Sequence, residues 1–142
     1  MARMSNLQNP ALADAGRLLL RVSLGALILL HGIAKISGGV GGIAGMVKGA
    51  GLPGELAYLV YIGEVVAPLL LIVGFWTRPA ALIVAINMLA AIFLAHRGDL
   101  LSLDKSGGWA LELQGMFLFA AIAVSLLGAG RLSIGGAGGR WN

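Results

Sequence analysis

Residues 17–35, RLLLRVSLGALILLHGIAK, decide the fold of this chain. The stretch is cationic at both ends and aliphatic between them, and as an α-helix it would be about 27 Å long. That length is close to the hydrocarbon thickness of a bilayer, so the stretch predicts a membrane span. Arg21 and His31 lie inside it, where an ionisable side chain is costly, by about 2.5–3.5 kcal/mol for arginine. Both side chains therefore need protein partners on other segments.

The composition extends this prediction to the whole chain. The 142 residues are 58% hydrophobic and 11% charged, with a mean hydropathy of +0.93. Soluble domains carry about 25% charged residues, and a soluble fold could not hide this much apolar surface. Helical periodicity, not alternation, governs the apolar segments, which argues against a transmembrane barrel. We predict a single all-α domain, an integral membrane four-helix antiparallel bundle, with spans at about 17–36, 56–76, 80–96 and 109–128.

The loop between the first two spans is rich in glycine, with eight glycines in residues 37–54. Residues 39–44 formally match a dinucleotide-binding fingerprint, but no strand precedes them, so nucleotide binding is not expected. Ile43, Met46 and Val47 share one helical face. This spacing predicts a short interfacial helix within a periplasmic loop.

The cations favour one orientation. With four spans both termini lie on one side, which also holds most of the arginines nearest the span ends, so the termini are predicted to be cytoplasmic. Residues 1–15 lack an apolar core and predict a cytoplasmic arm without a cleaved signal peptide. Residues 135–142 predict a mobile tail. No basic run is interleaved with aromatic residues, so nucleic acid is not an expected partner.

Several short motifs spread along the chain resemble those of the DoxX family of small bacterial membrane proteins. The motifs are Leu-Leu-Leu-Arg21, Gly25, His31-Gly32-x-x-Lys35, Gly51-Leu52-Pro53, Glu64, Gly74-Phe75-Trp76-Thr77-Arg78 and Gly128-x-Gly130-Arg131-Leu132-Ser133. The resemblance implies four transmembrane helices in the bacterial inner membrane. It also implies, for some members, association with membrane-bound redox systems, including a quinone-linked sulfur oxidoreductase.

Depth along straight helices predicts which polar groups meet. At about 1.5 Å per residue, His31 and Glu64 reach a similar level, so we predict that they pair, with Tyr61 donating to the carboxylate. Beside an imidazole, a carboxylate in a low-dielectric site can share or pass a proton. A quinone needs hydrogen-bond partners for its carbonyls and a proton route, and this group of side chains is predicted to supply both.

Other polar side chains form two further levels. A ring of polar groups is predicted at the periplasmic rim of the same pocket, comprising Lys35, His96, Glu112 and Gln114. Arg21 lies near the inner face, where Asn87 is the intramembrane side chain within reach, and both are predicted to be structural. For Arg21 the favoured interpretation is snorkelling to the inner headgroups.

Alternatives remain open for the candidate site. The pairing of His31 with Glu64 also fits a purely structural role, in which the contact fixes the register of the bundle. His31 and His96 could be axial ligands of a haem, although their levels differ by about one helical turn. The chain has no cysteine, which removes thiolate-ligated clusters, and no metal site is predicted.

The function predicted from these residues and from the resemblance is that of a quinone-interacting or accessory subunit of a membrane oxidoreductase. His31 and Glu64 would be its catalytic pair, and no covalently bound cofactor is expected. The first alternative is a non-catalytic scaffold or assembly factor that recruits redox-enzyme subunits. A second is a small transporter or proton channel, which would need to oligomerise.

Overall fold

The computed structural model describes residues 9–142, which are helical apart from turns, loops and one isolated bridge between Leu103 and Trp109. Helix α1 (Pro10–Gly38) begins seven residues before the predicted span, because Asn9 caps it and Pro10 fits its first turn. The side chain of Asn9 accepts a hydrogen bond from the Ala11 amide at 3.0 Å. The predicted N-terminal arm therefore ends at this cap, and its residues 1–8 lie outside the described part of the chain.

The second apolar segment runs from Gly54 to Val73 through three kinds of helical turn. It starts as a 3-10 helix, η2 (Gly54–Leu59), widens into a π-helical turn, η3 (Ile62–Val66), and ends as helix α3 (Ala67–Val73). Pro68 lacks the amide hydrogen that would continue the ordinary ladder. The wide turn directly before it positions Glu64, and such turns frequently occur at functional sites.

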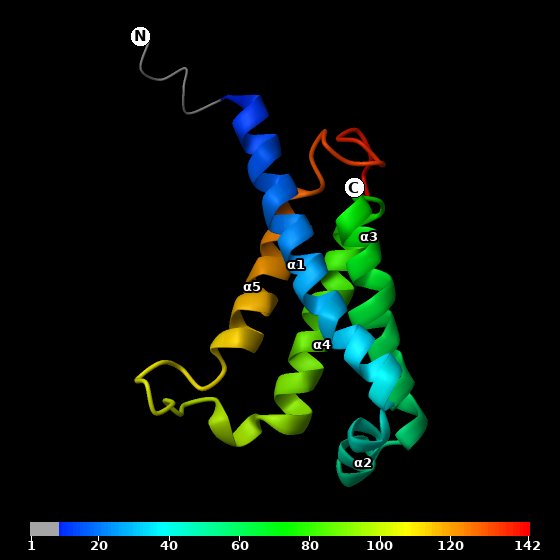
Figure 1. The fold of residues 1–142 in the computed structure, drawn as a ribbon, viewed down its shortest axis with the longest axis vertical. Coiled ribbons are helices and arrows are strands. Elements are labelled where there is room, and N and C mark those ends of the chain that lie inside the picture. The colour runs from blue at the N-terminus through cyan, green and yellow to red at the C-terminus, as the bar shows by residue number, and fades with distance from the viewer. Residues whose placement is uncertain (1–8) are drawn as a thin grey trace.

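Helix α4 (Thr77–Ala95) follows a tight turn, in which Gly74 and Trp76 both adopt positive φ, at 73° and 47°. Helix α5 (Glu112–Leu127) is the last helix of the fold. Helices α4 and α5 pack along each other, as do α1 and α3 (Figure 1). The buried core between them is aliphatic and includes Leu24, Ile28, Leu71, Val84, Ala121 and Val124.

Within residues 9–142, three helical segments are long and apolar enough to cross a membrane: Pro10–Gly38, Gly54–Val73 and Thr77–Ala95. Helix α5 is apolar but has 16 residues, about 24 Å of helix, which is shorter than a typical hydrocarbon core. The prediction of an all-helical membrane protein is thus confirmed, whereas a fourth full span stays a prediction.

Two glycines allow α1 to lie directly against the second segment. A Cβ atom on Gly25 would come within 2.8 Å of the Pro68 carbonyl oxygen, and one on Gly32 within 2.1 Å of the Glu64 carbonyl oxygen. No L side chain fits at such distances. The contact sets the register between α1 and the π-helical turn.

Two connecting segments complete the fold. Helix α2 (Gly41–Gly49) forms in the glycine-rich loop where a short helix is predicted, and it packs against η2 and α4. Residues 128–142 fold over the opposite end of the helices, next to the start of α1 (Figure 1). The prediction of a mobile tail is wrong in this structure, because Asn142 accepts hydrogen bonds from the amide and hydroxyl of Thr77, and the Gly135 amide donates to Gly74.

Candidate functional site

The centre of the candidate site is Glu64, which is 5% exposed and lies in the π-helical turn. Its Oε2 forms an ion pair with Nζ of Lys35 on α1, and its Oε1 accepts a hydrogen bond from Nδ2 of Asn87 on α4 at 3.1 Å. Gly63 makes room for this arrangement, since a Cβ there would lie 2.6 Å from the Asn87 amide group. Three helical segments therefore converge on one carboxylate.

The predicted pairing of His31 with Glu64 is wrong. Both oxygens of Glu64 are engaged by Lys35 and Asn87, while the His31 ring stands edge-on to Phe117 at a centroid distance of 6.0 Å. His31 is exposed at the surface of α1, not buried. The depths estimated along straight helices gave the wrong partner for Glu64 for two reasons. The 3-10 and π turns shift Glu64 relative to α1, and the Lys35 side chain extends one turn down from the rim.

Tyr61 also differs from its prediction. Its hydroxyl donates to the backbone carbonyl of Lys35 at 3.1 Å and not to the Glu64 carboxylate. This bond fixes the backbone from which the Lys35 side chain extends. Tyr61 therefore acts on the carboxylate only through Lys35.

A large cavity lies on one side of the Lys35–Glu64 ion pair. Its volume is about 500 Å³, and apart from Lys35, Glu64 and Asn87 its walls are apolar. The walls come from α2, the second segment and α4, and include Val47, Leu56, Ile83 and Ile86. Ile86 is 64% exposed, so the cavity reaches the apolar outer surface of the helices. Its volume and lining are typical of a site for a small apolar molecule with a polar group.

A smaller cavity also borders the Lys35–Glu64 ion pair. Its volume is about 150 Å³, and it is lined by residues of α1, η3, α4 and α5. Its polar lining consists of His31, Lys35, Glu64 and Gln114. Lys35 and Glu64 line both cavities, as does Ala91. His31 and Glu64, predicted to touch, instead face this shared space.

The predicted rim residues separate into different contacts. Gln114 Nε2 lies 3.3 Å from His96 Nε2, and His96 Nδ1 lies 3.4 Å from Asp99. Glu112 instead accepts a hydrogen bond from the Trp109 amide at 3.1 Å, in the turn that leads into α5. The rim is therefore no single ring, since only Lys35 and Gln114 among its members line the small cavity.

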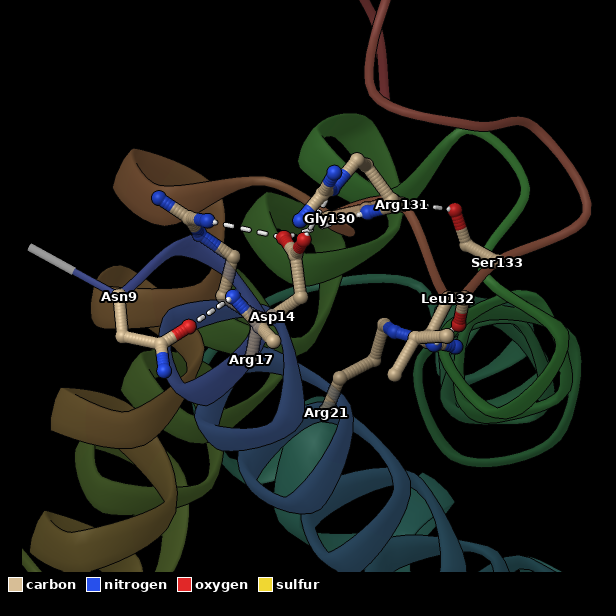
Figure 2. A network of polar contacts seen from close by, with 9 residues as sticks. Asn9, Asp14, Arg17, Arg21, Gly130, Arg131, Leu132 and Ser133 are labelled. Atoms are coloured by element: carbon tan, nitrogen blue, oxygen red, sulfur yellow. Dashed lines mark hydrogen bonds and ion pairs between the residues drawn. The ribbon is translucent and has the colours of Figure 1, made fainter.

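Arg21 contradicts both predictions made for it. Its side chain is 1% exposed and does not snorkel to the surface. One terminal nitrogen donates to the carbonyls of Leu71 and Ile72 at 2.7 and 2.8 Å, and the other donates to Leu132 at 2.7 Å. Asn87 is bonded to Glu64 and is not its partner. Figure 2 shows the guanidinium lying between α1 and the chain at Leu132.

An acidic residue that sequence reasoning treated as part of the arm completes this end of the molecule. Asp14 is 5% exposed and forms ion pairs with Arg17 on α1 and Arg131 after α5 (Figure 2). The signal in the sequence was the spacing of Asp14 and Arg17, three residues apart, which is typical of one helical face. Arg131 could not be paired with them by local pattern.

Comparisons with known proteins agree with this architecture. The profile of the DoxX family matches residues 16–97, more than half of the chain. The chain belongs to the DoxX family. A relative from Bacillus subtilis (strain 168), named "Putative oxidoreductase CatD", is 33% identical over 79 residues, which cover 56% of this chain and 58% of that protein. The chain thus matches less than two thirds of that relative's length, and no solved structure was found to match.

The DoxX match includes every residue that holds the central carboxylate. Lys35, Glu64 and Asn87 all lie within residues 16–97, as do Arg21 and His31. Gln114 and Arg131 lie beyond the matched region. The large cavity is lined wholly by residues of the DoxX match, whereas the small cavity needs α5.

The described residues of the DoxX protein do not fit a haem or a metal ion. His96 is not among the residues that line the small cavity with His31, and about 150 Å³ is less than a ligand of that size requires. The two imidazoles therefore do not face a common space for a haem. Within residues 9–142, no group of three or more His, Asp or Glu side chains is placed to hold a metal ion.

Proposed function

We propose that this DoxX protein binds a quinone in the large cavity and works as a quinone-interacting or accessory subunit of an oxidoreductase system in the bacterial inner membrane. The observation that carries the proposal is the position of the Lys35–Glu64–Asn87 cluster at an apolar cavity of about 500 Å³. The name of the Bacillus relative, "Putative oxidoreductase CatD", supports the same class of function.

The lining of the cavity suits such a ligand. A membrane quinone is an apolar molecule with two carbonyl acceptors on a ring. Exposed wall residues such as Leu56, Leu59 and Ile86 give it an entrance from the acyl chains, without passage through water. The ring would stop at the three polar side chains, which are the only ones in the lining.

Each polar side chain has a defined task in this proposal. Lys35 has three N–H donors and uses one on Glu64, so it retains donors for a quinone carbonyl. Asn87 holds one carboxylate oxygen and orients the group. Glu64 can accept a proton or release one, which an amide at that position could not do. A bound quinone supplies the redox chemistry, its electrons coming from the partner oxidoreductase, and this chain supplies a binding site and a proton-exchanging group.

The proposal extends to topology. The DoxX protein would cross the membrane four times, with α5 as the shortest span and both termini in the cytoplasm. The arginines predicted at the cytoplasmic face include Arg78 and Arg131, which lie with residues 128–142 at one end of the helices. Charged labels attached to either end of the chain would test this orientation in sealed vesicles. Labels at both ends should be accessible from the cytoplasmic side and protected from the other side.

The test is binding of short-chain benzoquinone and naphthoquinone analogues to purified protein in lipid nanodiscs. Glu64→Gln and Lys35→Met should weaken binding at least tenfold, because each removes a charge-assisted hydrogen bond. Glu55→Gln is a matched control, since Glu55 lies in the same segment outside the cavity and should bind like the wild type. Equal affinities for the Glu64 and Glu55 variants would overturn the site.

A second pair of variants tests the cavity by its volume. Ile86→Trp should fill the space and abolish binding, because Ile86 is part of the wall. Leu89→Trp, one turn further along α4 and 54% exposed, should leave binding unchanged. If Ile86→Trp binds quinone as well as Leu89→Trp does, and redox enzymes co-purify with the protein, the scaffold function replaces the quinone site.

A further inference from the structure

We propose that the small cavity is a hydrated compartment through which Glu64 exchanges protons with water at the α4–α5 loop, by way of Gln114 and His96. The inference deepens the role given to Glu64 in the proposed function and so rests on that site. It does not depend on the chemical identity of the ligand in the large cavity.

The lining of the small cavity favours water. Its volume is about 150 Å³, against roughly 30 Å³ for one molecule of liquid water. An empty cavity persists where the walls are apolar, whereas a buried water needs two to four polar partners. His31, Lys35, Glu64 and Gln114 provide such partners from three different segments of the chain.

The contacts beyond the cavity lead outward to solvent. Since an amide nitrogen only donates, His96 Nε2 accepts from Gln114, and its Nδ1 proton then points to Asp99. The side chain of His96 is 35% exposed and that of Asp99 is 50% exposed, so water reaches this end. An exposed carboxylate, an imidazole and an amide thus follow one another from the loop to the cavity at Glu64.

The proposed transfer moves one proton and no electrons. One proton passes from bulk water through the imidazole of His96 and the waters of the cavity to the Glu64 carboxylate, which becomes neutral. The reverse transfer restores the carboxylate. Titratable or charged groups that face Glu64 are Lys35 and His31 from α1, while α4 and α5 contribute the neutral side chains of Asn87 and Gln114. Gln114 is a positioning residue, because it orients water and does not itself give up a proton.

The two cavities differ in their lining and in where they open, which would let a ligand and its protons reach Glu64 separately. The large cavity is apolar and reaches the outer surface of the helices, whereas the small cavity has four polar side chains in its lining, of which Gln114 contacts His96 at the loop. Because Lys35 and Glu64 line both, a ligand in the large cavity can exchange protons with water that it does not touch. An apolar ligand and its protons would therefore arrive by different routes.

The test follows the Glu64 carboxyl group by infrared spectroscopy in protein without added quinone. At acidic pH the carboxyl band is assigned by its loss in Glu64→Gln, and its hydrogen–deuterium exchange is timed after transfer to D2O. Gln114→Met, which keeps the length of the side chain, and His96→Phe should each slow the exchange at least tenfold. Met116→Leu, on the exposed face of the same helix, should match the wild type. Exchange as fast in Gln114→Met as in Met116→Leu would overturn the route.

Cysteine labelling gives a second measurement should a variant fail to fold. The natural chain has no cysteine, so single cysteines report one position at a time. In sealed vesicles a charged, water-soluble thiol reagent should label Gln114→Cys at least tenfold faster than Met116→Cys. Equal labelling rates would mean that the cavity is dry. Because no quinone is used in either experiment, this inference can fail while quinone binding stands, and the reverse is equally true.

Discussion

Arg21 and Glu64 are both buried charges within apolar helices, but they are held by different kinds of partner. Arg21 donates to three main-chain carbonyls, and it lines neither of the two cavities. Glu64 is held by two side chains and lines both cavities. The main-chain carbonyls that hold Arg21 are fixed in the backbone. The side chains of Lys35 and Asn87, which hold Glu64, can rearrange when a ligand arrives.

The difference separates stability from chemistry in this molecule. Arg21 ties α1 to the end of α3 and to residues 128–142, so its contacts hold together segments that are more than a hundred residues apart. Glu64 joins α1, η3 and α4 next to open space, where hydrogen-bonding capacity remains for a ligand. We therefore expect substitutions near Arg21 to unfold the protein and substitutions near Glu64 to change what it binds.

The largest effect on stability is expected for Arg21→Met. The change removes the arginine donor from three main-chain carbonyl groups, which should lower the free energy of unfolding by about 2–4 kcal/mol. The measurement is thermal or denaturant unfolding in detergent micelles. Arg17→Met is the matched control, because Arg17 is partly exposed and, among the described residues, its side chain bonds to Asp14 alone, in the same helix turn. Its expected cost is below about 1 kcal/mol, and equal costs for the two variants would break the comparison.

The next effect concerns the register between α1 and the π-helical turn. Gly32→Ala places a methyl group 2.1 Å from the Glu64 carbonyl oxygen, so α1 must move and the free energy of unfolding should fall by about 1–3 kcal/mol. On the same helix, nothing lies within 4 Å of a Cβ at Gly16. Gly16→Ala should therefore be neutral or stabilise by up to about 1 kcal/mol. Unfolding curves for the two variants would measure how closely the turn at Glu64 packs on α1. A Gly32→Ala protein as stable as the wild type would contradict the close contact.

How far the sequence alone predicts this molecule can be judged from the same residues. The apolar stretch at 17–35 and its three successors predicted helices at the right places, since burial in lipid is a strong constraint on composition. The boundary at Pro10 was missed because the Asn9 cap and the Asp14–Arg17 pair extend α1 into polar sequence. Such local signals are weaker than hydropathy.

The candidate site was predicted in part for a physical reason. Single polar residues in apolar helices indicated Glu64, Lys35 and Gln114, and all three line one cavity. Their pairing was not predictable from straight-helix depth, because the π turn changes both rise and direction around Glu64. The carbonyl partners of Arg21 carry no side-chain signal at all, and those at Leu71 and Leu132 are contributed by ordinary apolar residues.

A smaller effect is expected at the tail, whose order sequence reasoning did not foresee. Asn142 accepts hydrogen bonds from the Thr77 amide at 3.2 Å and the Thr77 hydroxyl at 2.9 Å, at the start of α4. Asn142→Ala should cost about 1–2 kcal/mol, the usual loss for a helix cap. Asn9→Ala removes a cap that is exposed and local to α1, so about 0.5 kcal/mol is expected. Should Asn142→Ala unfold like the wild type, the tail contributes nothing to the Arg21 end.

The smallest effect lies at Asp104, a carboxylate in the exposed loop before α5. The Ser106 hydroxyl at 2.6 Å, helped by the amides of Ser106 and Gly108, holds the pKa of Asp104 below its usual value. Since the folded pKa is the lower one, the loop contacts gain stability above about pH 4 and lose it as the pH falls through the folded pKa. Ser106→Ala should raise the Asp104 pKa, as measured by an NMR titration of its carboxyl carbon, while Ser102→Ala should not. Because Asp104 is solvated, the free energy of unfolding should hardly change across this titration. A large change in the free energy of unfolding would mean that the loop is tightly coupled to the helices. The proposed route from water to His96, which starts in this loop, would then depend on the stability of the whole bundle.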